Sequence, residues 1–196
     1  RNALLESRRC LRAGASEAEA MAAAKVFASF SGTMRANLVA MLDAVGLARH
    51  LELPSTDVLW GRESRLAQFT SALRYPVFCN GANYSGSPDI LRTPLLRDQL
   101  MRWFAPEMAA LGDAVFVPLG PKVAEAVAFA ARETGVPETR VLAGLPHPSG
   151  ANAERIAFFL GRKQRTALSA KVDPDRLLAA RAEIERRIAA LGRRAA

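Results

Sequence analysis

The sequence has few of the residues that build metal centres and disulfide frameworks. Its 196 residues include two cysteines and two histidines. Cys10 and Cys79 lie far apart and lack the close spacing of metal-ligand pairs, so we expect no metal site. A reduced, cytoplasmic protein is the simplest interpretation of this cysteine usage.

Long apolar runs and phosphate-binding glycine motifs are also missing. No stretch approaches the roughly 18 apolar residues of a membrane span, and no signal-peptide pattern opens the chain, so no membrane partner is expected. The glycine-containing segment 81–86 fits neither the dinucleotide-binding motif nor the P-loop. A nucleophile elbow and a zinc-ligand cluster are absent as well. These absences exclude most common enzyme classes.

What the chain does have is positive charge, with a formal net charge of +8 and a sequence pI of about 10.5. Such a balance favours a polyanionic partner, and nucleic acid is favoured over a membrane surface. The alternative is a solvated face in an arginine-rich protein. Part of the charge lies at the C-terminus, in Arg186, Arg187, Arg193 and Arg194. Length and composition indicate one domain over residues 1–196, with a C-terminal helix at about 173–192.

Short apolar runs alternate with segments of helical periodicity. The runs cover residues 75–80, 114–120 and 141–145, and also 25–30, which suits either a strand or an inward-facing loop. The helical segments cover residues 37–50, 95–111, 123–133, 153–160 and about 173–192. This alternation predicts an α/β fold, with three α/β/α layers around a central, mainly parallel four-stranded sheet.

His147 holds a special place in this pattern. It follows the apolar run 141–145 and precedes the helical segment 153–160, for which Asn152 is a candidate N-cap. The carboxyl ends of parallel strands and the N-termini of helices are places where ligands and anions bind. The alternative is a surface turn that Pro146 and Pro148 make rigid.

Four motifs occur in a fixed order along the chain. They are the segment Phe30-Ser31-Gly32-Thr33-Met34-Arg35-Ala36-Asn37-Leu38, the strand-ending Asn80, Leu119-Gly120, and His147-Pro148-Ser149. Over about residues 14–160 this series resembles the uracil-DNA glycosylase superfamily. In that family the Asn reads the base and the His-Pro-Ser motif closes the active site. In its bacterial iron–sulfur branch, the Phe of the first of these segments stacks on the base. The resemblance implies an enzyme that hydrolyses the N-glycosidic bond of uracil or a related deaminated base in DNA.

The resemblance also implies roles for single residues. A neutral His147 would donate a hydrogen bond to the oxyanion that develops on the departing base. The amide of Asn80 matches the edge of uracil, Phe30 supplies a flat wall, and Tyr84 lies on the loop that follows. Each role has a structural alternative, because Asn80 also suits a turn and Phe30 a core.

The chain that follows His147 contains three residues that we expect to bind a DNA phosphate. They are Ser149, Asn152 and Arg155. Ser149 alternatively caps a turn. Ala151 stands where the family usually has a larger residue that wedges into the duplex, and it is too small for that task. Arg155 would then act as a cationic probe in place of the wedge.

The family's first motif, which holds the water-activating group, is not matched. The corresponding region 14–20 has no proline or tyrosine, although Glu17 or Glu19 offers a carboxylate unless the segment is a solvated helix face. Asn83, beside Tyr84, is the other catalytic candidate. The cluster cysteines of the family's iron–sulfur branch are missing, so no cofactor is expected.

Three functions therefore stand as hypotheses. The first is a divergent DNA glycosylase, with a preference for single strands because its wedge is weak. The second is a binding protein of the same family that holds flipped bases or abasic sites without cleaving them. The third is an α/β protein that binds a small phosphorylated ligand at the His147 turn.

Overall fold

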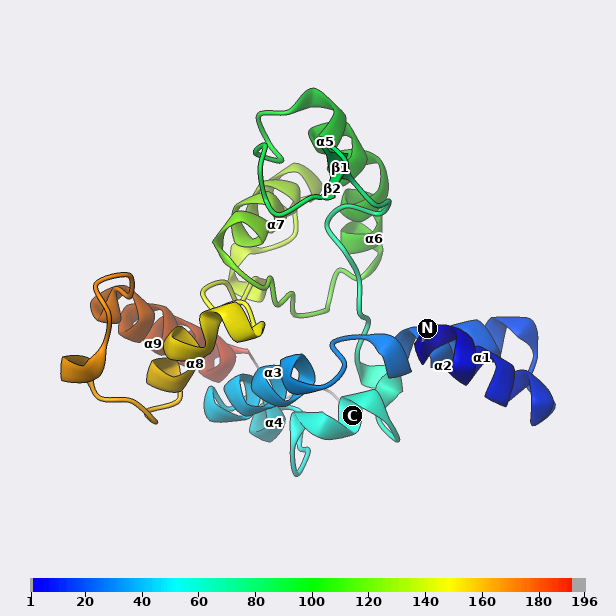
Figure 1. The fold of residues 1–196 in the computed structure, drawn as a ribbon, viewed down its shortest axis with the longest axis horizontal. Helices are drawn as coiled ribbons and strands as arrows, with labels where there is room; N and C mark the ends of the chain where they lie inside the picture. Colours follow the sequence, from blue (N-terminus) through cyan, green and yellow to red (C-terminus); the bar gives the residue numbers. More distant parts are fainter. Residues whose placement is uncertain (1, 192–196) are drawn as a thin grey trace.

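The computed structural model describes residues 2–191, which are mainly helical (Figure 1). The helices are α1 (Asn2–Arg12), α2 (Glu17–Ala28), α3 (Thr33–Ala44), α4 (Leu47–His50), α5 (Pro94–Gln99), the π-helical turn η3 (Leu100–Phe104), α6 (Ala105–Ala110), α7 (Pro121–Thr134), α8 (Ala153–Phe159) and α9 (Pro174–Ala190). Two short strands are β1 (Phe78–Cys79) and β2 (Ala82–Asn83). The connections contain the 3-10 turns η1 (Thr56–Trp60), η2 (Ser64–Leu66), η4 (Glu138–Arg140), η5 (Gly150–Asn152) and η6 (Arg165–Ala167).

The predicted α/β fold is wrong. Within residues 2–191 the sheet consists of β1 and β2 alone, paired antiparallel as a hairpin. A central four-stranded parallel sheet, and the three layers that it would organise, do not occur in this part of the chain. The reasons lie in the individual apolar runs that suggested strands.

The run 25–30 belongs mostly to a helix, since α2 extends through Ala28. A capping box starts this helix: the Ser16 hydroxyl accepts from the Glu19 N–H at 3.3 Å, and Glu19 Oε2 accepts from the Ser16 N–H at 2.9 Å. The alanine-rich sequence that follows has high helix propensity. Propensity and capping together outweigh the apolar character of the run.

The run 75–80 is not a buried strand either. Tyr75 and Phe78 are 54% and 63% exposed, and only Phe78 and Cys79 have strand pairing. Pro76 has no N–H to donate to a ladder. The chain then reverses at Asn80, so the segment forms one side of a hairpin.

The runs 114–120 and 141–145 do lie side by side, but they share a single parallel bridge between Phe116 and Val141. The Phe116 N–H donates to the Arg140 carbonyl, and the Phe116 carbonyl accepts from the Leu142 N–H, both at 2.8 Å. Pro118 lacks an N–H, and Gly144 adopts a φ of +121°. The parallel pairing therefore does not extend into a sheet.

The helix predictions are confirmed in broad terms. Residues 123–133 lie in α7 and 153–160 largely in α8, while 95–111 contains α5, η3 and α6 in succession. The predicted helix over 37–50 is interrupted at Gly46, which has a φ of +86° between α3 and α4. Asp173 caps α9, accepting from the Arg176 N–H at 3.0 Å. Residue 192, at the end of the predicted C-terminal helix, lies outside the described residues, as do Arg193 and Arg194.

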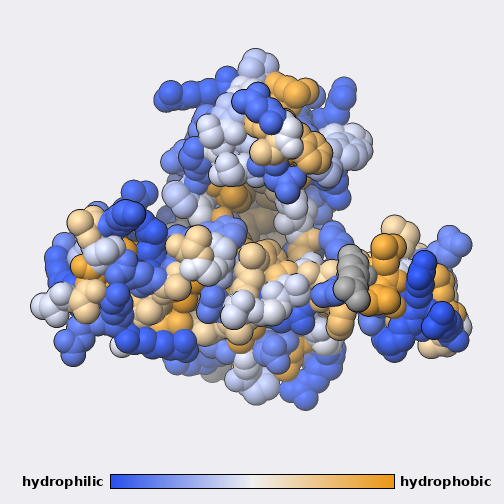
Figure 2. Space-filling view, in the orientation of Figure 1, coloured by the Kyte–Doolittle hydropathy of each residue, from blue (hydrophilic) through white to orange (hydrophobic). Residues whose placement is uncertain are grey.

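Two apolar cores organise the structure. One lies among α5, η3, α6 and α7, and includes Leu100, Met108 and Ala130. The other joins α3, α4, α8 and α9 with the segment before His147, and includes Met41, Phe159 and Ile184. Figure 1 shows the first group above the second, and Figure 2 shows a hollow between them whose floor carries apolar residues.

The helices α1 and α2 form a hairpin that extends from the side of the molecule as an arm (Figure 1). They pack mainly on each other, around Cys10, Ala20 and Ala24. None of the helices in residues 2–191 is long and apolar enough to cross a membrane.

Candidate functional site

The turn that carries His147 is fixed between buried neighbours. Pro146 and Pro148 are both buried, whereas His147 and Ser149 are half-buried. The Asn37 side chain, from α3, donates to the Pro148 carbonyl at 3.0 Å. Two prolines and this hydrogen bond restrict the backbone, so the imidazole has a defined position at the surface.

Gly120, at the start of α7, lies against the imidazole. A Cβ atom built on Gly120 would stand 3.6 Å from His147 Cβ and 4.0 Å from His147 Cδ2. The φ of Gly120 is +95°, a conformation that favours glycine. The structure therefore brings together the Leu119-Gly120 and His147-Pro148-Ser149 motifs, with Asn37 of the Phe30 segment joined to the same turn.

The protonation pattern of His147 follows from a local hydrogen bond. The backbone N–H of Ser149 donates to His147 Nδ1 at 3.3 Å. A nitrogen that accepts a hydrogen bond carries no proton, so the proton of the neutral ring is on Nε2. His147 therefore presents an N–H donor on the side of the ring that faces away from its own backbone turn.

The three predicted phosphate-binding residues form a chain of hydrogen bonds after this turn. Asn152 Nδ2 donates to Ser149 Oγ, and Arg155 Nη1 donates to Asn152 Oδ1, each at 3.3 Å. Arg155 Nη2 also donates to the Lys171 carbonyl at 2.7 Å. Asn152 precedes α8 as predicted but makes no N-cap hydrogen bond. Its side chain instead connects Ser149 with Arg155.

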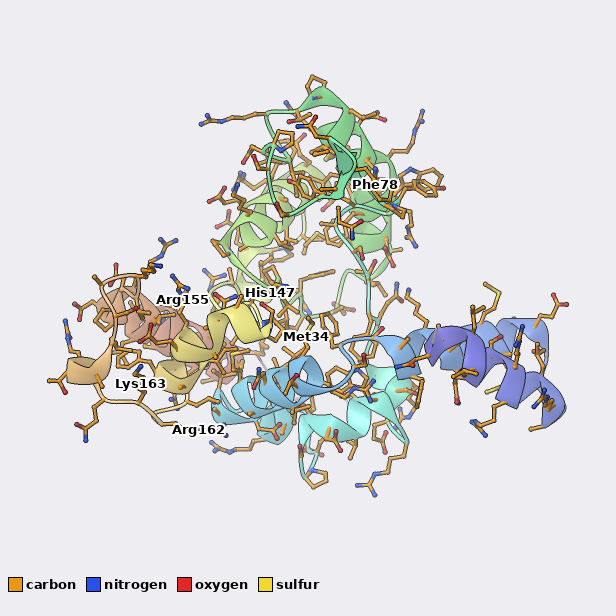
Figure 3. The ribbon with its side chains drawn as sticks, in the orientation of Figure 1. Met34, Phe78, His147, Arg155, Arg162 and Lys163 are labelled. Atoms are coloured by element: carbon orange, nitrogen blue, oxygen red, sulfur yellow. The ribbon has the colours of Figure 1, made fainter. Side chains whose placement is uncertain are left out.

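Basic side chains surround α8 beyond Arg155. Figure 3 shows Arg155, Arg162 and Lys163 on the part of the molecule that also carries His147. Lys163 is held by Glu154, whose Oε1 lies 2.8 Å from the ammonium nitrogen. Hydrogen bonds from Lys163 and then from Ser169 lower the pKa of Glu154 to about 2. Glu154 thereby ties the loop after α8 back to the helix.

Phe30 lies just before α3 with a φ of +50°, a left-handed conformation that is uncommon for phenylalanine. It is half-buried and packs against the core that contains Leu38 and Leu145. Its ring also meets Phe69 edge-on, with the centroids 6.0 Å apart. Phe30 is thus part core and part surface, and its base-stacking role stays a prediction.

Asn80, Asn83 and Tyr84 lie together on the β1–β2 hairpin. Asn80 and Gly81 have φ values of +51° and +77°, as a type I′ turn requires. The Tyr84 hydroxyl donates to the Pro88 carbonyl at 2.7 Å, and burial raises the pKa of Tyr84. None of the hydrogen bonds found for residues 2–191 joins these three residues to His147. Their binding and catalytic roles stay predictions.

The hairpin loop nevertheless approaches the His147 turn indirectly. The Lys122 ammonium, in the first turn of α7, donates to the Gly86 carbonyl. Lys122 follows Gly120 by two residues, and Gly120 lies beside His147. The loop after Tyr84 is therefore attached to the same end of α7 that borders the imidazole.

Glu17 lies apart from all of these residues. It is exposed in the first turn of α2. That turn is at the far end of the arm, distant from α7 and α8 (Figure 1). Glu19 is occupied as the capping-box partner of Ser16. The structure brings neither carboxylate to His147.

Reasoning from the sequence missed two features of the structure, one at the His147 turn and one beside Phe30. Asn37 lies inside the segment that carries the resemblance, yet its contact with Pro148 joins positions 111 residues apart and has no local signal. The aromatic group of Trp60 and Phe69 comes from a connection with few recognisable features. The Trp60 indole N–H donates to the carbonyl of Ser29, the residue before Phe30. Trp60 therefore lies near Phe30 only in the folded chain.

Comparison with known proteins gives one curated relative of note. The "Uncharacterized protein YoxB" of Bacillus subtilis (strain 168) is 38% identical over 144 residues, which are 72% of this chain and 56% of that protein. The chain thus spans little more than half the length of this relative. No profile of a known protein family matches the chain, and no solved structure matches it significantly.

Proposed function

We propose that this protein is a divergent DNA glycosylase of the uracil-DNA glycosylase superfamily. In the reaction the bond between the sugar C1′ and the base nitrogen breaks, and its electron pair leaves with the base. Water then supplies a hydroxyl group to C1′ and a proton to the base. The target base must leave the stack to reach a protein side chain, which costs a few kcal/mol and favours unpaired sites.

The observation that carries the proposal is the hydrogen bond from the Ser149 N–H to His147 Nδ1. It leaves Nε2–H as a donor, and a donor aimed at developing negative charge is the usual largest contribution to such catalysis. Gly120, whose φ of +95° favours glycine, borders the imidazole. These features suit stabilisation of an oxyanion on a departing pyrimidine.

The surroundings of His147 also suit a DNA backbone. Ser149 and Asn152 offer polar groups beside the imidazole, and Arg155 adds a guanidinium that hydrogen bonds already orient. Contacts of this kind position a protein on DNA without reading its sequence. We assign phosphate binding to these three residues and hydrogen bonding to the base to His147.

A second candidate function is binding of unpaired bases or abasic DNA without cleavage. The position of Glu17 at the end of the arm favours it, because no carboxylate from the predicted first motif lies beside His147. A protein with the donor but without a water-activating group would retain the base and leave the glycosidic bond intact. The two candidates share a binding surface and differ in chemistry.

One assay separates the two candidates. The protein is incubated with a single-stranded oligonucleotide that contains one uracil, treated with alkali, and tested for strand cleavage at the uracil. A matched oligonucleotide with thymine at that position is the control. We expect cleavage of the uracil strand alone. A gel shift on the same strand without cleavage would reject the glycosylase and support the binding protein.

A further inference from the structure

A concave site lies beside Phe30, between the end of α2 and the connection that follows η2. It is a pocket of about 280 Å³. Its lining combines aromatic rings, hydroxyl groups and cations, from Lys25, Ser29, Phe30, Phe69, Thr70, Ser71 and Arg74. A lining of this composition suits a ligand that has both a flat ring and negative charge.

The aromatic wall of the pocket is held by stacking and by a hydrogen bond. Trp60 stacks on Phe69 with the ring centroids 4.8 Å apart and an interplanar angle of 26°. Trp60 is itself held by a hydrogen bond from its indole N–H to the Ser29 carbonyl at 2.9 Å. The Arg35 guanidinium lies 5.3 Å from the centre of the Trp60 ring. Trp60 covers one face of Phe69, and Phe69 still lines the pocket.

The two cations of the pocket, Lys25 and Arg74, differ in whether a carboxylate balances their charge. Arg74 pairs with Glu107 at 2.9 Å, and Glu107 also accepts from the Thr70 hydroxyl at 2.8 Å. The charge of Arg74 is therefore balanced within the protein. Lys25 is exposed at the rim, so its ammonium supplies the positive charge that an anion would meet.

We infer that this pocket binds one unpaired nucleotide of single-stranded DNA, with the base against Phe69 and the phosphate at Lys25. The volume lies just below the roughly 300–1,000 Å³ of drug-sized ligand sites, which suits a single nucleotide better than a large cofactor. Aromatic platforms with nearby cations are the common means of binding single strands, because every base has a flat face. Bases in a duplex are already stacked and do not reach such a pocket.

This inference rests on the proposed function for its choice of DNA, and it names single strands as the preferred substrate. Phe30 lines the pocket and precedes α3, whose Asn37 holds the His147 turn. A strand with its target base at His147 would then have another nucleotide held near Phe69. The two sites would act on one strand.

The test uses a labelled oligothymidylate that contains no uracil, with fluorescence anisotropy measured over a series of salt concentrations. Phe69→Leu keeps the apolar volume and removes the aromatic face, and we expect about 5- to 150-fold weaker binding. Lys25→Gln should make the slope of log K against log salt less steep by about 0.7, the loss of one phosphate contact. Phe78→Leu, at an exposed phenylalanine of the hairpin, and Arg176→Gln, on α9, are the matched controls and should change neither value.

The outcomes distinguish this inference from the proposed function. Unchanged oligothymidylate binding in both folded variants, checked by circular dichroism, would overturn the pocket even if uracil excision is observed. Binding of thymidine monophosphate is measured for the same two variants. If they lose binding of thymidine monophosphate but still bind oligothymidylate as wild type does, the pocket holds a free nucleotide and the inference is overturned. Variant-sensitive strand binding without excision would sustain the pocket and reject the glycosylase.

Discussion

At the scale of single residues, the central feature is how neighbours orient His147. The buried prolines on either side fix the backbone, and the Ser149 N–H determines which ring nitrogen holds the proton. Gly120 lies beside the ring, with a φ of +95° that favours glycine. A donor held in this way needs little reorganisation when negative charge develops opposite it.

Gly144, three residues before His147, gives a prediction about stability. Its φ is +121°, and an added Cβ would stand 2.8 Å from Ala180 Cβ on α9. We expect Gly144→Ala to lower the free energy of unfolding by about 1–3 kcal/mol, because backbone strain adds to this close contact. Urea denaturation measures the change.

The matched control is Gly112→Ala, where the new Cβ meets the Ala109 carbonyl at an ordinary 3.6 Å. Its effect should stay within about 0.5 kcal/mol. Equal stabilities for the two variants would contradict the close approach of α9 to the segment before His147.

At the scale of elements, α8 and the loop after it act as one basic unit. Glu154 accepts from Lys163 and from the Ser169 N–H, while Arg155 donates to the Lys171 carbonyl. Two adjacent side chains of α8 thus hold both ends of a loop that carries several cations. This arrangement keeps the loop beside the predicted phosphate-binding residues.

The lowered pKa of Glu154 gives a prediction about pH. The folded-state pKa, about 2, lies below the ordinary value of 4.5, so its stabilising effect is present above the ordinary value and is lost as the pH falls toward 2. We expect the stability difference between wild type and Glu154→Gln to shrink over that interval. Glu133→Gln, at an exposed position of α7, is the control. A difference that is constant with pH would show that the Glu154 carboxylate does not hold the loop.

Several elements could be predicted from the sequence because their signals are local. The helix α9 has its Asp173 cap and Pro174 at the first position, and α7 has a clear amphipathic pattern. The strands could not be predicted correctly, because a short apolar run does not reveal whether partners will pair with it. Pro118 and Gly144 prevent the pairing of 114–120 with 141–145 from extending beyond one bridge.

The candidate site shows the same division. Gly120 and His147, which belong to two of the motifs, lie beside each other in the folded chain. Asn80 was predicted to read a base, and its φ of +51° is accounted for by the hairpin turn it forms with Gly81. The role of Phe69 depends on rings that meet only after folding, so no local pattern indicates it.

At the scale of the whole molecule, the formal net charge of +8 predicts the salt dependence of DNA binding. Each neutralised phosphate contributes a slope of about −0.7 for a single strand in a plot of log K against log salt. We expect a steep slope that corresponds to several contacts, measured by titration of a uracil-containing strand. Affinity that does not change with salt would contradict a DNA-binding surface and favour a small phosphorylated ligand.

We propose that His147 stabilises the departing base, and the single-turnover rate of uracil excision from a single strand measures this role. His147→Ala is compared with His50→Ala, the other histidine of the chain, which ends α4 and belongs to no motif. We expect His147→Ala to slow excision by about 10²–10³-fold, as loss of one such donor does, with His50→Ala at the wild-type rate. Excision by folded His147→Ala at the wild-type rate would show that His147 does not stabilise the departing base.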